Sequence, residues 1–169
     1  AVQLASAGLD NRNGQIQAVG NLLLDSAQGV IDNALGLIRS GATVTLNALQ
    51  FINDDTKAEN KGLEGQAVAL NTGSLSNRGG SILANQQLTI TNGGQLDNSA
   101  GQLAASENLR LQGAALNLLN TGGIVKAGKL LDINAAAVGG DGQLLSLGDM
   151  NLVSAQGINN SGEMIANGN

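Results

Sequence analysis

The sequence repeats a short phrase about every 21 residues, and this period constrains the fold more than any other feature. The phrase is an aliphatic residue, a polar residue, Asn, two or three variable positions, Gly, one residue and a second aliphatic residue. Its copies begin at Leu9, Ile31, Leu75, Leu96, Leu118 and Ile158. A fixed period of this size indicates a stacked architecture in which each unit contacts only its neighbours.

A second signature in each unit predicts β-strands. Two apolar residues separated by one residue recur, as in Leu88/Ile90 and Leu109/Leu111, and this alternation is typical of a strand with one buried face. Gly, Asn and Ser interrupt every unit and disfavour helix interiors. We therefore predict an all-β fold, a right-handed parallel β-helix (solenoid) with about 21 residues per coil and seven to eight coils.

In a parallel β-helix, equivalent residues of successive coils stack in columns. The opening aliphatic column is predicted to contain Leu9, Ile31, Ile52, Leu75, Leu96, Leu118, Val138 and Ile158. A ladder of corner amides is predicted from Asn11, Asn33, Asn77, Asn98, Asn120 and Asn160, with Asp54 and Gly140 in the same column of two irregular coils. Asn suits tight corners, and stacked amides can hydrogen-bond along the ladder. A Gly column provides either positive φ or room for close backbone approach at Gly14, Gly36, Gly80, Gly101, Gly123 and Gly162.

Composition excludes several classes of function. The chain has no Cys and no His, which removes disulfides, thiolate ligands and the commonest general base and transition-metal ligand. The net charge is −5, and no basic cluster or aromatic platform is present, which disfavours nucleic acid as a partner. No apolar run approaches the length of a membrane span. We therefore expect no transmembrane segment, no cofactor or metal site and no catalytic residue; the protein is interpreted as not being an enzyme.

The third unit departs from the repeat. About four residues are inserted between its two aliphatic positions, Ile52 and Leu63. The insertion concentrates five charged residues, Asp54, Asp55, Lys57, Glu59 and Lys61. We expect residues 54–61 to protrude from the rod as a solvated loop, and the same five residues are the candidate contact site for a partner, because insertions in repeat proteins map to loops. A calcium site is disfavoured, because these carboxylates lack the spacing of a recognised calcium-binding loop.

The repeat resembles that of filamentous haemagglutinin. The phrase runs from Leu9 to Ala18 and is followed by a Gly-x-Leu-x-Leu strand from Gly20 to Leu24; similar copies contain Gly80-Ser81-Ile82 and Gly101-Gln102-Leu103. The resemblance implies a bacterial exoprotein that is secreted to the cell surface through an outer-membrane pore by two-partner secretion. Members of that family include adhesins, haemagglutinins and the toxin-delivering effectors of contact-dependent growth inhibition.

The leading functional hypothesis is a structural shaft that extends and presents distal binding or toxin regions. On this hypothesis residues 1–169 are a single repeat segment excised from a longer repetitive protein. The alternative is a module that itself binds a receptor on a host cell or a neighbouring bacterium through the third-unit loop. A remote alternative is a polysaccharide-active β-helical enzyme. Cut ends of a β-helix expose strand edges, so the isolated segment is also expected to stack end to end.

Overall fold

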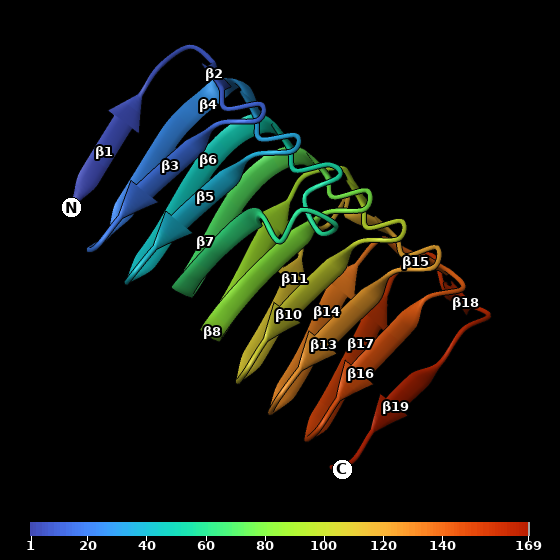
Figure 1. The fold of residues 1–169 in the computed structure, drawn as a ribbon. Helices are drawn as coiled ribbons and strands as arrows, with labels where there is room; N and C mark the ends of the chain where they lie inside the picture. The colour runs from blue at the N-terminus through green and yellow to red at the C-terminus, as the bar shows by residue number, and fades with distance from the viewer. Residues whose placement is uncertain (169) are drawn as a thin grey trace.

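Every strand of the protein pairs in parallel with the equivalent strand one coil away. In the coil that contains Asn120, for example, β12 (Asn117–Leu119) pairs with β9 (Gln95–Asp97) of the coil before and with β15 (Ala137–Gly140) of the coil after. The computed structural model describes residues 1–168, which form a parallel β-solenoid of about eight turns with no helix (Figure 1). Its strands are β1 Val2–Ala5, β2 Leu9–Asp10, β3 Gln15–Ala18, β4 Leu22–Asp32, β5 Leu37–Ser40, β6 Thr43–Ile52, β7 Gly62–Ser76, β8 Ser81–Asn92, β9 Gln95–Asp97, β10 Gln102–Ala105, β11 Asn108–Gln112, β12 Asn117–Leu119, β13 Ile124–Ala127, β14 Leu130–Ala135, β15 Ala137–Gly140, β16 Gln143–Ser146, β17 Asp149–Ser154, β18 Ile158–Asn160 and β19 Met164–Ala166.

Each coil contributes to three parallel faces. Face 1 contains β10, β13 and β16, face 2 contains β11, β14 and β17, and face 3 contains β12, β15 and β18. In the earlier coils the long strands β4, β6, β7 and β8 run round one or two corners and so belong to more than one face. The corner between face 3 and face 1 holds the repeated Asn and is here called the asparagine corner. Coils are numbered by their residue in this column, so that Asn33 marks the second coil and Asn98 the fifth.

The core is a set of aliphatic columns that run along the axis. On face 1, Leu63, Ile82, Leu103 and Val125 stack in register, and each is fully buried. On face 2, Leu109 and Leu111 alternate with outward-facing residues, as the period of two predicts. Inward residues stack on the equivalent, mostly aliphatic residues of neighbouring coils. The narrow interior is therefore filled without aromatic side chains other than Phe51.

The predicted register is wrong by one residue in the third coil. Phe51, not Ile52, pairs with Ile31 and Leu75 and points into the core. Phe51 is fully buried, whereas Ile52 is half-buried and pairs with Ser76. Phe51 and Ile52 are both apolar, so the alternating pattern alone could not show which of them faces the core. A register shift of one residue exchanges the buried and the exposed face of the strand. The correction also moves the ladder position of this coil from Asp54 to Asn53.

The first and last coils lack a neighbour on one side. Leu4 lies above the fully buried Leu24 but is 37% exposed. Met164 lies beside the fully buried Leu144 but is 47% exposed. The columns are therefore continuous through the middle coils and open to solvent at both ends of the rod.

Candidate functional site: the asparagine corner and the third-coil loop

The asparagine corner contains a continuous chain of amide hydrogen bonds. The Nδ2 atom of each Asn donates to Oδ1 of the next, at 2.6 Å from Asn11 to Asn33 and at 2.8 Å for each later step as far as Asn120. The same Nδ2 atoms also donate to main-chain carbonyls of the following coil, as from Asn98 to Ile124 at 3.2 Å. Asn53, which the sequence interpretation missed, is the central rung and is fully buried. The six rungs are Asn11, Asn33, Asn53, Asn77, Asn98 and Asn120.

The amide chain stops at the seventh coil, where Gly140 occupies the position and has no side chain. Gly140 pairs with Asn160 of the eighth coil, so the backbone column continues. Asn160 nevertheless makes no amide hydrogen bond, because both its side-chain polar atoms are buried without a partner among the described residues. Asn160 is therefore in the column but is not a rung of the ladder, contrary to the prediction.

The Gly column is explained by close approach rather than by positive φ. A Cβ on Gly101 would lie 2.6 Å from Oδ1 of Asn98, and closer still to the carbonyl oxygen of Asn77. The positive φ of the turn belongs to the residue just before, which is Ala100 at 53° or Leu35 at 57°. The corner thus demands a missing side chain at one position and a left-handed backbone at the one before it.

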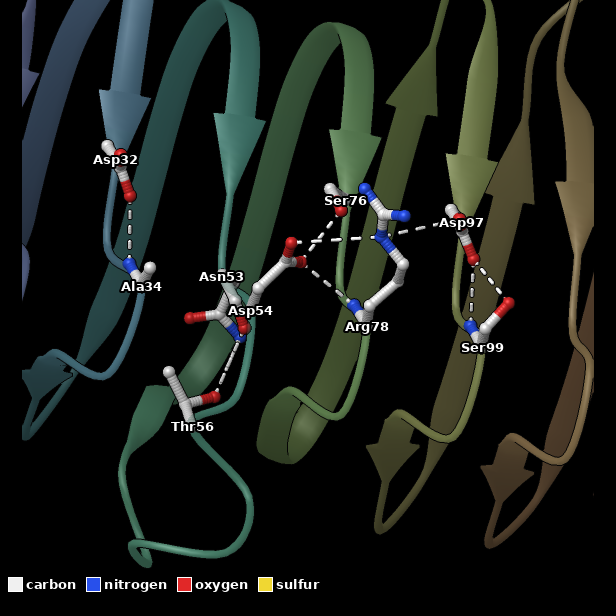
Figure 2. Close-up of polar contacts among 9 residues, drawn as sticks. All are labelled: Asp32, Ala34, Asn53, Asp54, Thr56, Ser76, Arg78, Asp97 and Ser99. Atoms are coloured by element: carbon white, nitrogen blue, oxygen red, sulfur yellow. Dashed lines mark hydrogen bonds and ion pairs between the residues drawn. The ribbon is translucent and has the colours of Figure 1, made fainter.

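A carboxylate closes the turn in the first, second and fifth coils. In the fifth coil, Oδ1 of Asp97 accepts the main-chain N–H of Ser99 at 2.9 Å and its hydroxyl at 2.6 Å (Figure 2). Asp32 accepts the N–H of Ala34 in the same way at 3.0 Å. This aspartate stands immediately before the ladder Asn, so the hydrogen bond is an Asx turn that fixes the start of the corner.

The fourth coil has Ser76 where these coils have aspartate, and Asp54 of the third coil provides the carboxylate instead. Oδ1 of Asp54 accepts the hydroxyl of Ser76 at 2.7 Å and the N–H of Arg78 at 2.9 Å (Figure 2). Nε of Arg78 lies 3.8 Å from Oδ2 of Asp54 and 3.7 Å from Oδ2 of Asp97. Asp54 therefore belongs to the corner of the rod, and residues 54–61 do not protrude as one unit.

Thr56 compensates for the insertion. In regular coils the Gly carbonyl accepts the N–H that begins face 1 of the next coil, as Gly101 accepts from Ile124 at 2.9 Å. In the third coil the Gly carbonyl is missing, and the hydroxyl of Thr56 accepts the N–H of Ser81 at 3.0 Å. Thr56 is fully buried, and no signal in the repeat phrase singled it out.

Only the apex of the loop leaves the corner. Face 1 begins four residues after Asn98 in the fifth coil but nine residues after Asn53 in the third, at Gly62. Residues 57–60 are exposed, whereas Lys61 is half-buried. Nζ of Lys57 donates to the carbonyl of Ala100 at 2.8 Å, and Nζ of Lys61 donates to that of Leu35 at 3.0 Å. The two lysines thus attach the loop to coils on opposite sides of it.

The five candidate contact residues therefore divide into two groups. Asp54 is half-buried and bonded to the fourth coil, and Lys61 is half-buried against the second coil. Asp55, Lys57 and Glu59 are exposed and remain accessible to a partner. Asp55 has a φ of 57°, like Leu35 and Asn13 at the equivalent corner position, so it too follows the regular turn.

A second charged cluster lies on the first two coils of the corner. Arg12 donates to both carboxylate oxygens of Asp10, at 3.0 Å and 2.7 Å, and lies 3.7 Å from Oδ2 of Asp32. The hydrogen bonds from Arg12 lower the pKa of Asp10 from 3.8 to about 2, because they stabilise the ionised carboxylate. The described residues contain no group of three or more Asp and Glu side chains placed to hold a metal ion.

Comparison with known families identifies the repeat. The haemagglutinin repeat model matches the chain four times, at residues 1–63, 63–125, 98–136 and 127–169. The chain belongs to the haemagglutinin repeat family. Haemagglutinin repeats form a structural family that builds filamentous, adhesin-type exoproteins, which are typical of secreted and cell-surface locations. Comparison with curated proteins and with solved structures gave no match.

Residues 1–168 include no helix of sufficient length and apolar character to cross a bilayer.

Proposed function

We propose that this chain is a shaft segment of a secreted, cell-surface filamentous bacterial exoprotein. The observation that carries the proposal is continuity: the aliphatic columns pass through the irregular third coil without interruption, from Ile38 through Leu63 to Ile82. At about 4.8 Å per coil, about eight coils form a rod roughly 35–40 Å long. Such a segment acts by spacing and presentation, and it needs no catalytic group.

The export route fits the same chemistry. The absence of Cys prevents disulfides from locking the chain before it passes through a pore, and the absence of Pro leaves every ladder position able to donate. Folding outside the cell can then proceed coil by coil. These features support two-partner secretion through an outer-membrane pore, with an adhesin tip or a growth-inhibiting toxin presented at the far end of the longer protein.

Deletion of whole coils in the full exoprotein tests the shaft proposal. Removing residues 99–120 joins Asn98 directly to Thr121, so that one coil is lost with the register preserved. Removing residues 99–109 deletes half a coil and misaligns every column. We expect the first variant to fold, to shorten the filament by one rise and to keep cell attachment, and the second to misfold. If the first variant folds but no longer attaches, the segment is not a passive spacer.

A second candidate function is receptor binding by the exposed apex of the third-coil loop. The observation that favours it is the exposure of Lys57 and Glu59 on a mixed-charge projection. Deleting the loop would also remove Thr56, so the better test exchanges the charges as Lys57→Glu together with Glu59→Lys. Loss of attachment in this folded double variant would support binding by the apex. Attachment of the parent protein that weakens as the salt concentration rises would support it further. Unchanged attachment would exclude the apex.

Two further proposals concern the isolated segment. Because the terminal coils expose Leu4 and Met164, we expect end-to-end association at high concentration, measurable by analytical ultracentrifugation.

The remaining alternative, an enzyme that acts on polysaccharides, is tested by assaying release of reducing ends from neutral and acidic glycans. We expect none.

A further inference from the structure

Face 3 carries a shallow trough that runs along the axis of the rod. One hollow of about 320 Å³ is lined by Gln50, Ser74, Ser76 and Gln95 and bordered by Arg78 and Asp97. A second hollow of about 580 Å³ begins at the same Gln95 and continues past Asn117 and Leu119 to Asn159. Because the two hollows share Gln95, they form one surface across the third to eighth coils.

Ser76 and Asn117 of the trough donate to Asp54 at 2.7 Å and to the carbonyl of Ala115 at 3.4 Å, but its two glutamines are uncommitted. The side chains of Gln50 and Gln95 make no hydrogen bond within residues 1–168. Arg78 uses only Nε, at 3.7 and 3.8 Å from its two carboxylates, and its side chain is 63% exposed. Figure 2 shows its guanidinium between the ends of β7 and β9, with the terminal nitrogens directed away from the turn. The terminal nitrogens of Arg78 can therefore donate at the border of the trough, where Oδ2 of Asp97 makes only the 3.7 Å ion pair with Nε of Arg78.

The spacing of these groups is set by the fold. Gln50, Ser74, Gln95 and Asn117 occupy one outward column of face 3, because their strands pair in register. Neighbouring members are about 4.8 Å apart, which is close to the length of one pyranose unit in an extended β-linked chain. Planar amides, a carboxylate and a guanidinium are the groups that hydrogen-bond sugar hydroxyls in pairs, and Leu119 offers an apolar contact for a ring face.

We propose that this trough binds an extended, uncharged polysaccharide chain lying parallel to the rod axis, with about one sugar per coil. Two carboxylates, Asp54 and Asp97, flank the single guanidinium of Arg78, and the whole chain carries a net charge of −5. An acidic glycan would be repelled by this arrangement. The trough has no aromatic platform, so each sugar is held weakly and affinity grows with the number of coils engaged. This inference goes beyond the shaft role, since a rod can space a tip without binding anything along its side.

The test is a titration of the isotopically labelled 169-residue chain with cellohexaose, followed by NMR. We expect saturable shifts confined to face 3, including the side-chain amides of Gln50, Gln95 and Asn117. The variants Gln95→Ala and Arg78→Gln should each weaken binding by about fivefold or more, the effect of one lost hydrogen bond. Gln87→Ala is the matched control, because Gln87 is an exposed amide on face 2 and makes no hydrogen bond within residues 1–168.

Three results would overturn the proposal. The first is the absence of saturable shifts at millimolar cellohexaose, and the second is equal binding by the parent, Gln95→Ala and Arg78→Gln. The third is a preference for heparin that salt abolishes, which would indicate attraction by charge. Thermal melts of all three variants check that each remains folded. Coil deletion tests the shaft role, whereas this titration tests binding along the side of the rod. A negative result in one experiment therefore does not affect the interpretation of the other.

Discussion

The fifth coil and the third coil build the same corner from different residues. In the fifth coil Asp97 closes the turn, Asn98 forms the rung and Gly101 accepts from the next coil. In the third coil Asn53 still forms the rung, but the carbonyl's role passes to the hydroxyl of Thr56. The stacked coils therefore require the same hydrogen bonds at each corner, but different side-chain or main-chain groups can make them. An insertion is tolerated where its own side chains replace the groups it displaces.

The largest effect is expected in the core that the two coils share. Leu103→Asp in the fifth coil and Leu63→Asp in the third should each cost roughly 4 kcal/mol or more, because an unpaired charge would enter a dry column. Both residues are fully buried in the same column. Chemical denaturation measures the loss. If Leu63→Asp is tolerated while Leu103→Asp is not, the third coil does not share the core.

The amide ladder comes next. Asn98→Ala and Asn53→Ala should each lower the free energy of unfolding by about 1–3 kcal/mol, since each leaves buried donors and acceptors unpaired on both neighbours. The cost should be below that of the core substitutions and similar in the two coils. Urea denaturation of the two variants side by side gives the comparison. A neutral Asn53→Ala would mean that the ladder is broken at the insertion.

The hydroxyl of Thr56 is the sharpest difference between the coils. Thr56→Val keeps the shape but removes the acceptor for the N–H of Ser81, and should cost about 1–2 kcal/mol. Thr56→Ser keeps the hydroxyl and is the matched control, with a smaller loss. Amide hydrogen exchange at Ser81 should speed up in the valine variant alone. Equal exchange in both variants would show that the hydroxyl is not the acceptor.

Limited proteolysis compares the loop with the rest of the rod. Trypsin should cut after Lys57 first and after Lys61 next, before Arg39, Arg110 or Lys129. The latter three are paired with carboxylates of neighbouring coils, as in the 2.9 Å ion pair from Arg110 to Asp132. Mass spectrometry of early fragments identifies the sites. First cleavage in the regular coils would mean that the two lysine contacts hold the loop as firmly as the strands.

The smallest effect is expected at the exposed pair in the first coil. Arg12→Ala should raise the pKa of Asp10 from about 2 back toward 3.8, measured by NMR titration of the carboxyl group. Because the folded pKa is the lowered one, the stabilisation by this pair is present above the ordinary pKa and is lost as pH falls through about 2. Stability near neutral pH should hardly change, since exposed ion pairs contribute little. A large loss at pH 7 would contradict that reading.

The sequence alone determined the period, the strand type, the family and most of the columns. Inward columns such as Leu96 and Leu118 were predictable because a residue stacked on copies of itself leaves the same mark in every repeat. The same holds for Asn77, Asn98 and Asn120, where each unit repeats the chemical requirement. These positions could therefore be identified by comparing the repeats of this one sequence with each other.

Only the tertiary structure determined which residues take the core and corner roles where the repeat is irregular. Phe51 and Ile52 are equally apolar, so the choice between them depends on pairing with Ile31 and Leu75 in other coils. Asp54 reads as a loop charge, yet it closes the turn of the fourth coil, 22 residues further along the chain. Thr56 has no counterpart elsewhere in the repeat. Such roles are set by which groups a neighbouring coil leaves unpaired, and no periodicity within the third unit carries that information.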